Sequence, residues 1–97
     1  MSKIKCVVLT TGLELMGDVE EKHESVTLKD AAHVAMVPQN GKMGYAIIPW
    51  LPYAENSSFN LNVNNILTTF EPSVDMLNYY SQVMGTGIQI ATASSIN

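Results

Sequence analysis

The sequence predicts a mainly β fold, namely a small and strongly bent antiparallel barrel of five strands with a C-terminal helix. Two observations in one segment predict the barrel. Residues 13–20 alternate apolar and polar side chains with the period of two that a strand with one buried face requires. Gly17 falls on the apolar face of that strand, and a glycine there indicates a bulge, a bend or a close approach of two backbones. A long strand that curls around a small core needs such a point.

The remaining strands follow from alternation and from turn residues. Residues 3–9 begin the sheet, and Cys6 among them is interpreted as a small buried hydrophobic residue. Thr11-Gly12 predicts a tight turn, and Asn40-Gly41 supplies the positive φ angles of a hairpin. The pattern of the third strand is interrupted at residues 30–32, where we expect a bend. The predicted strands cover residues 3–9, 13–22, 25–37, 43–50 and 66–70.

A helical period replaces the strand period after Pro72. Val74, Leu77 and Met84 fall on one stripe, Ser73 is placed to cap the N-terminus, and Gly85 is a natural stop. Flanking apolar residues widen the stripe, so we expect this helix to be covered on more than one side. The predicted organisation is a barrel over residues 1–71, a helix over 72–85 packed on the barrel or on a neighbour, and a short tail or extra strand over 86–97.

Composition limits the classes of partner. Only 14% of the 97 residues are charged, which indicates that part of the surface is covered by other subunits. The chain has five lysines, no arginine and a net charge of −4, whereas proteins that grip phosphate backbones carry a basic stripe. There is no apolar run of the roughly 20 residues that a membrane span needs, and no signal peptide at the start. A cytoplasmic location without membrane partners is therefore predicted.

No residue pattern typical of catalysis is present. The sequence lacks a nucleophile–base pairing and a phosphate-binding glycine loop, so it predicts no enzyme and no cofactor. Its two histidines, His23 and His33, have no partners at metal-ligand spacing. Trp50, Tyr53 and Phe59 fit either packing at a strand end or a platform on which bases stack.

Two segments resemble the motifs of the Sm/LSm family, and more narrowly the Sm-like proteins of tailed phages, including phages of cyanobacteria. The first motif is carried by Leu9-x-x-Gly12, by Gly17, and by Val26-x-Leu28-x-Asp30-Ala31. The second falls on residues 61–66, with Asn62 and Val63 where the family has Arg-Gly. The resemblance covers about residues 3–70 and implies an Sm-like, SH3-like barrel. Here the helix follows the barrel, whereas the family places it before the first strand.

The resemblance also implies a homo-oligomeric ring of five to seven subunits that binds single-stranded RNA or DNA around its pore. Ser25 stands where the family has a base-binding asparagine, and Asn62 stands where it has a base-clamping arginine. The candidate nucleic-acid-binding residues are His23, Ser25, Lys29, Asn62, Asn64 and Asn65. The candidate subunit-interface residues on the exposed strand edges are Tyr45, Ile47, Ile66, Thr68 and Phe70. The host cytoplasm is the expected location if a phage encodes the chain.

A second hypothesis remains open. The ring is then a structural or adaptor component that binds a protein partner and no nucleic acid. The absence of arginine and the net charge of −4 favour this alternative. The asparagines of residues 60–65 also have two interpretations. Their amide side chains either form hydrogen bonds with the backbone of a turn or recognise base edges.

Overall fold

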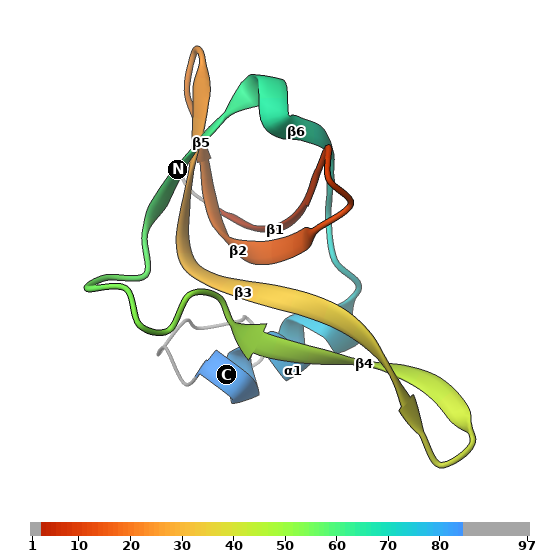
Figure 1. Ribbon diagram of the computed structural model, residues 1–97. Helices are drawn as coiled ribbons and strands as arrows, with labels where there is room; N and C mark the ends of the chain where they lie inside the picture. The colour runs from red at the N-terminus through yellow and green to blue at the C-terminus, as the bar shows by residue number, and fades with distance from the viewer. Residues whose placement is uncertain (1–2, 85–97) are drawn as a thin grey trace.

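A computed structural model describes residues 3–84, and Figure 1 shows them as one curved antiparallel sheet with a single helix packed on it. The predicted mainly β class with a C-terminal helix is confirmed. The strands number six rather than five, and the sheet is open. The elements are β1 (Lys3–Leu9), β2 (Glu14–Glu21), β3 (Ser25–Gln39), β4 (Lys42–Pro49), β5 (Phe59–Asn62), the 3-10 turn η1 (Val63–Asn65), β6 (Ile66–Phe70) and α1 (Val74–Met84).

The long strand β3 is the centre of the topology. The strands lie in the order β4-β3-β2-β1-β6, and β5 pairs with β3 beside this path. One side of β3 pairs with β2, while its other side pairs first with β5 and then, over Ala32–Gln39, with β4. The extra strand β5 was not predicted because only four residues form it. β4 and β6 are the terminal strands of the main path, β5 pairs with β3 alone, and η1 joins β5 to β6.

The close backbone approach predicted at Gly17 is confirmed. The register of β2 and β3 shifts there, so that Asp30 and Ala31 together lie opposite Gly17. Asp30 has a φ of 52°, which marks the predicted bend in β3. A Cβ atom on residue 17 would lie 2.6 Å from the carbonyl oxygen of Lys29 and 2.9 Å from Cδ1 of Leu28. The glycine therefore lets two bent strands touch.

Apolar side chains fill both faces of the sheet. The first cluster contains Val7, Leu15, Val19, Val26, Leu28 and Ala31. The second contains Cys6, Met16, Ala32, Ile47 and Tyr80. The alternation of residues 13–20 assigns Met16, with Glu14, Asp18 and Glu20, to the polar face. That assignment is wrong for Met16, because α1 covers this part of the face and leaves Met16 fully buried. Cys6 is buried as predicted.

Helix α1 is amphipathic and is covered on one side. Oγ of Ser73 accepts a hydrogen bond from the Met76 N–H at 3.2 Å, which confirms the predicted cap. Tyr80 is fully buried at the centre of the packed stripe, whereas Asp75, Asn78 and Gln82 are exposed on the opposite side. Within residues 3–84 the sheet covers one side of the helix, and cover of a second side by a neighbour stays a prediction. Gly85 and the predicted tail over residues 86–97 lie outside the described residues. Within residues 3–84, no helix has the length and the apolar character needed to cross a membrane.

Candidate nucleic-acid interface

Strand pairing brings Ser25 and Asn62 together. The two residues are direct partners in the ladder between β3 and β5. Side chains at such positions lie on the same face of the sheet, with Cβ atoms about 4.5–5.5 Å apart. Ser25 is half-buried and Asn62 is exposed. The two positions that the motifs suggested as base-contacting thus form one small polar surface, although they lie far apart in the sequence.

The amide of Asn62 has a fixed orientation. Its Oδ1 accepts a hydrogen bond from the Asn64 N–H at 2.8 Å, which caps the turn η1. Because a backbone N–H can only donate, the oxygen must face the turn and the Nδ2 amino group remains available as a donor. The N–H of Val63 donates to the carbonyl oxygen of Glu24 at 3.2 Å and ties η1 to the turn between β2 and β3. Asn62 therefore both satisfies the turn backbone and presents hydrogen-bond donors.

A hollow of roughly 380 Å³ lies beside this turn. The Thr10 N–H donates to the carbonyl oxygen of Asn65 at 2.9 Å and so brings the β1–β2 turn next to η1. The residues that line the hollow are Leu9, Thr10, Thr11, Asn60, Leu61, Asn62 and Asn65. Hydroxyl and amide groups surround an apolar floor, without a charged side chain. Sequence reasoning missed Thr10, Thr11 and Asn60, and only the asparagine-rich composition of residues 60–65 pointed towards the last of these.

Three other candidate nucleic-acid-binding residues, Asn64, His23 and Lys29, lie outside the hollow. Asn64 is exposed on η1 and does not line the hollow. His23 stands at the β2–β3 turn with a 95% exposed side chain, and its Nε2 lies 4.0 Å from the Glu24 carboxylate. Lys29 is exposed and four residues beyond Ser25 on β3, which is roughly 13 Å along a strand. Of the six candidates, Asn62 and Asn65 line the hollow, Ser25 lies beside Asn62 through strand pairing, and Asn64, His23 and Lys29 lie outside it.

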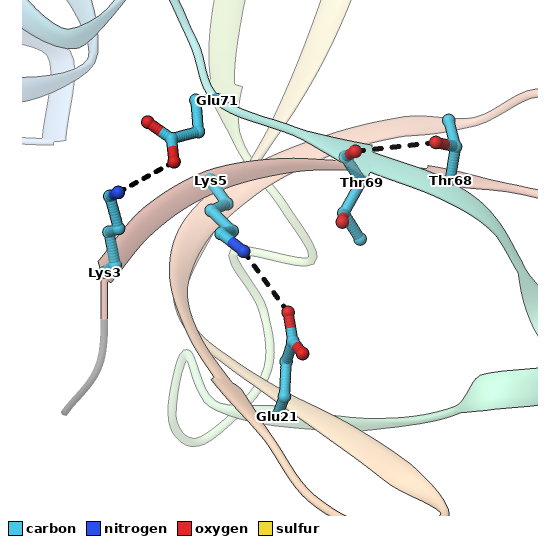
Figure 2. A network of polar contacts seen from close by, with 6 residues as sticks. All are labelled: Lys3, Lys5, Glu21, Thr68, Thr69 and Glu71. Carbon is cyan, nitrogen blue, oxygen red and sulfur yellow. Dashed lines mark hydrogen bonds and ion pairs between the residues drawn. The ribbon is translucent and has the colours of Figure 1, made fainter.

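Carboxylates already neutralise part of the positive charge. Nζ of Lys3 lies 2.8 Å from Oε2 of Glu71, and Nζ of Lys5 lies 3.3 Å from Oε2 of Glu21. Figure 2 shows both ion pairs. The hydrogen bond from Lys3 and the charge of its ammonium group lower the pKa of the Glu71 carboxyl. These two ion pairs engage two of the five lysines, so the part of the chain that the structure describes presents no basic stripe.

The terminal strands expose apolar side chains, but not all of those predicted. Ile47 of β4 is only 4% exposed because it packs under α1, so its side chain cannot meet a neighbour as predicted. Tyr45 is half-buried, Ile66 packs against the first cluster, and Thr68 is exposed. Phe70 is 47% exposed, as an interface residue would be. The exposed apolar residues that sequence reasoning missed are Met43 and Ile48 on β4 and Leu67 on β6.

The side chains of residues 3–84 also bear on two other kinds of site, an aromatic stacking platform and a metal site. The rings of Trp50 and Phe59 meet edge to face at 4.9 Å and pack against the first cluster, which favours the packing interpretation over a stacking platform. Among residues 3–84, His, Cys, Asp and Glu side chains do not come together in groups of three that could hold a metal ion. No family model matches the sequence, nor does any curated protein.

Proposed function

We propose that this chain is an Sm-like protein whose copies associate edge to edge into a ring that binds single-stranded RNA or DNA. The observation that carries the proposal is that the terminal strands β4 and β6 leave their edges and several apolar side chains uncovered. β4 and β6 end the sheet, and each exposes large apolar side chains: Met43 and Ile48 on β4, Leu67 and Phe70 on β6. An open edge of this kind is a template for pairing with another chain. Pairing β4 of one copy with β6 of the next covers both edges, and cyclic closure does so for every copy.

The path of the strands supports the Sm-like part of the proposal. β5 pairs with the start of β3, β6 pairs with β1, and only the short turn η1 separates the two. The series β5-β3-β2-β1-β6 thus curls around the first cluster, as Figure 1 shows. The motifs of residues 9–31 imply a strongly bent barrel of this kind. Because β5 and β6 do not pair with each other, β6 keeps a free edge, and β4 extends beyond the curl with another.

The polar hollow supports the nucleic-acid part. Asn62 presents amide donors next to Ser25, its partner in the strand ladder, and Asn65 lines the same hollow as Asn62. Neutral donors and acceptors above an apolar floor suit a nucleobase, which is flat, uncharged and rich in polar atoms at its edge. Because few cations are near, the hydrogen bonds and stacking carry most of the affinity. We therefore expect weak binding with a shallow dependence on salt.

Substitution of Asn62 and Asn64 by alanine tests this site. Fluorescence polarisation with short poly-U, poly-A and single-stranded DNA at about 50 mM salt, where backbone contacts are strongest, should show binding to the unaltered chain. The N62A/N64A variant should bind more weakly by several-fold, since it loses the amide donors and the cap of η1. Asn78→Ala is the matched control, because Asn78 is exposed on α1 away from the hollow. Equal affinity of the three proteins would remove the hollow from the proposal.

An adaptor function is the alternative that a specific observation favours. Net charge is −4 and the ion pairs of Lys3 and Lys5 further reduce the free positive charge. A ring with such a surface binds a protein partner rather than a phosphate backbone. Absence of any polarisation change at low salt, together with an oligomeric mass, would favour the adaptor. A monomeric mass by light scattering at micromolar concentration would contradict both versions, because both require the ring.

A further inference from the structure

Two asparagine amides in the polar hollow beside η1 have their oxygens engaged inside the protein. Asn60 and Asn62 both line this hollow. Oδ1 of Asn62 accepts the N–H of Asn64 at 2.8 Å. Oδ1 of Asn60 accepts a hydrogen bond from the hydroxyl of Thr27 at 2.7 Å. The amino group of each amide, which can only donate, is therefore the end that remains for a ligand.

Strand pairing holds the amide of Asn60 in place. Thr27 and Asn60 are direct partners in the ladder between β3 and β5, as Ser25 and Asn62 are, so all four side chains share one face. Thr27 is only 9% exposed, and a hydroxyl with so little access to water needs a partner in the protein, which Asn60 supplies. Asn60 and Asn62 are two positions apart on β5, roughly 6.8 Å along the strand. Two amino groups thus stand in a row beside the hollow.

A row of neutral donors distinguishes between the two kinds of nucleobase. Uracil and thymine carry a carbonyl oxygen at position 4, and guanine carries one at position 6, whereas cytosine and adenine carry an amino group at the same places. A carbonyl oxygen accepts from the amino groups of Asn60 and Asn62. An amino group on the base would oppose donor with donor and leave both unsatisfied. Leu9 and Leu61, which also line the hollow, offer apolar contact to the rest of the base.

We infer that the hollow selects keto bases, namely uracil, thymine and guanine, over the amino bases cytosine and adenine. Asn60 and Asn62 are the specificity-determining residues, and Thr27 is a positioning residue that acts through Asn60. The inference rests on the proposed binding of single strands, and it adds which bases are bound. A phosphate group also accepts hydrogen bonds, but it is the same in every nucleotide. Donors that met only phosphate would therefore give no preference among bases.

Labelled oligonucleotides of deoxyuridine and of deoxycytidine, equal in length, test this selection. They carry the same phosphates and sugars, and their bases differ in the groups at positions 3 and 4. Fluorescence polarisation with the full chain, at neutral pH and about 50 mM salt, should show about fivefold tighter binding of the deoxyuridine strand, the effect of one hydrogen bond. Equal affinities would overturn the inference and leave the proposed single-strand binding intact. Binding of neither strand would overturn both.

Three variants assign the selection to its residues through the ratio of the two affinities. Asn60→Asp replaces the amino donor by an acceptor, so the preference for deoxyuridine should disappear or reverse. Its added charge repels both strands alike, and Asn78→Asp, the same change on an exposed residue of α1 outside the hollow, should leave the ratio unchanged. Full preference in Asn60→Asp would overturn the inference.

Thr27→Val removes the hydroxyl that orients the Asn60 amide and keeps the shape of the side chain. The amide can then turn either way, so the preference for deoxyuridine should fall towards that of a site with no fixed donor. An unchanged ratio would contradict the positioning role of Thr27. Far-UV circular dichroism checks that each variant is folded, and Asn60→Asp, a change at an exposed position, serves if Thr27→Val is not.

Discussion

Gly17 is the residue at which an added methyl group should be most harmful. Its Cβ would lie 2.6 Å from a backbone oxygen of Lys29, which cannot move without separating β2 from β3. We expect Gly17→Ala to lower the free energy of unfolding by roughly 1–3 kcal/mol, the usual effect of overpacking. Gly44→Ala is the control, since its Cβ would meet only the flexible side chain of Gln39. Urea denaturation measures both, and equal effects would contradict the close approach at Gly17.

The Cys6 thiol provides a second test at the residue scale. Burial, aided by the charge of Glu14, raises its pKa from 9.0 to about 11. The folded chain therefore holds the proton more tightly than the unfolded chain. The stability that this contributes is complete below pH 9 and is lost as the pH rises towards 11. We expect alkaline pH to lower the urea midpoint over this range, and Cys6→Ala to reduce the dependence. A thiol reagent at pH 8 should react only as fast as the chain unfolds.

Single residues were predictable where one local rule decides their conformation. Gly12 has a φ of 93° in the predicted turn, a conformation that strains residues with a side chain, and Gly17 lies at a close approach where no side chain fits. Asn62 caps a turn, as amide side chains next to turns often do. Met16 and Ile47 were misplaced because their burial depends on α1, which is distant in the sequence. Alternation along a strand shows which residues share a face, but it does not show which face a distant element such as α1 covers.

At the scale of elements, Tyr80 is the main polar link between α1 and the sheet. Its hydroxyl donates to the carbonyl oxygen of Asp30 at the bend of β3, inside the second cluster. Burial raises its pKa, so the hydroxyl remains a donor at all ordinary pH values. Tyr80→Phe should cost about 1–3 kcal/mol of unfolding free energy, because it leaves a buried acceptor unsatisfied. Tyr79→Phe is the control on a half-buried neighbour. A loss no larger than that of the control would show that apolar contacts alone dock the helix.

The elements themselves were predictable to different degrees. The helix was located by its period and by Ser73, and the hairpin of β3 and β4 by Asn40-Gly41, since these signals are local. β5 was not separated from the polar stretch around it, because four residues carry too little alternation to identify a strand. Pairing of its Asn62 with Ser25 is a long-range contact that only the motif resemblance suggested.

At the scale of the whole molecule, the proposed ring would account both for the open edges of β4 and β6 and for the low charge. We expect Ile48→Lys on β4 and Leu67→Lys on β6 each to lower the mass measured by light scattering towards the 10.6 kDa of one chain. A charge on an edge strand opposes pairing with another sheet, and Lys is the residue that natural edges use for this purpose. Val74→Lys is the matched control, because Val74 is 69% exposed but lies on α1 and not on a strand edge. If only the two edge variants dissociate while all three keep the same circular dichroism, copies join through β4 and β6. If Val74→Lys dissociates the assembly as well, the contact involves α1, and the pairing of β4 with β6 is not what holds the copies together.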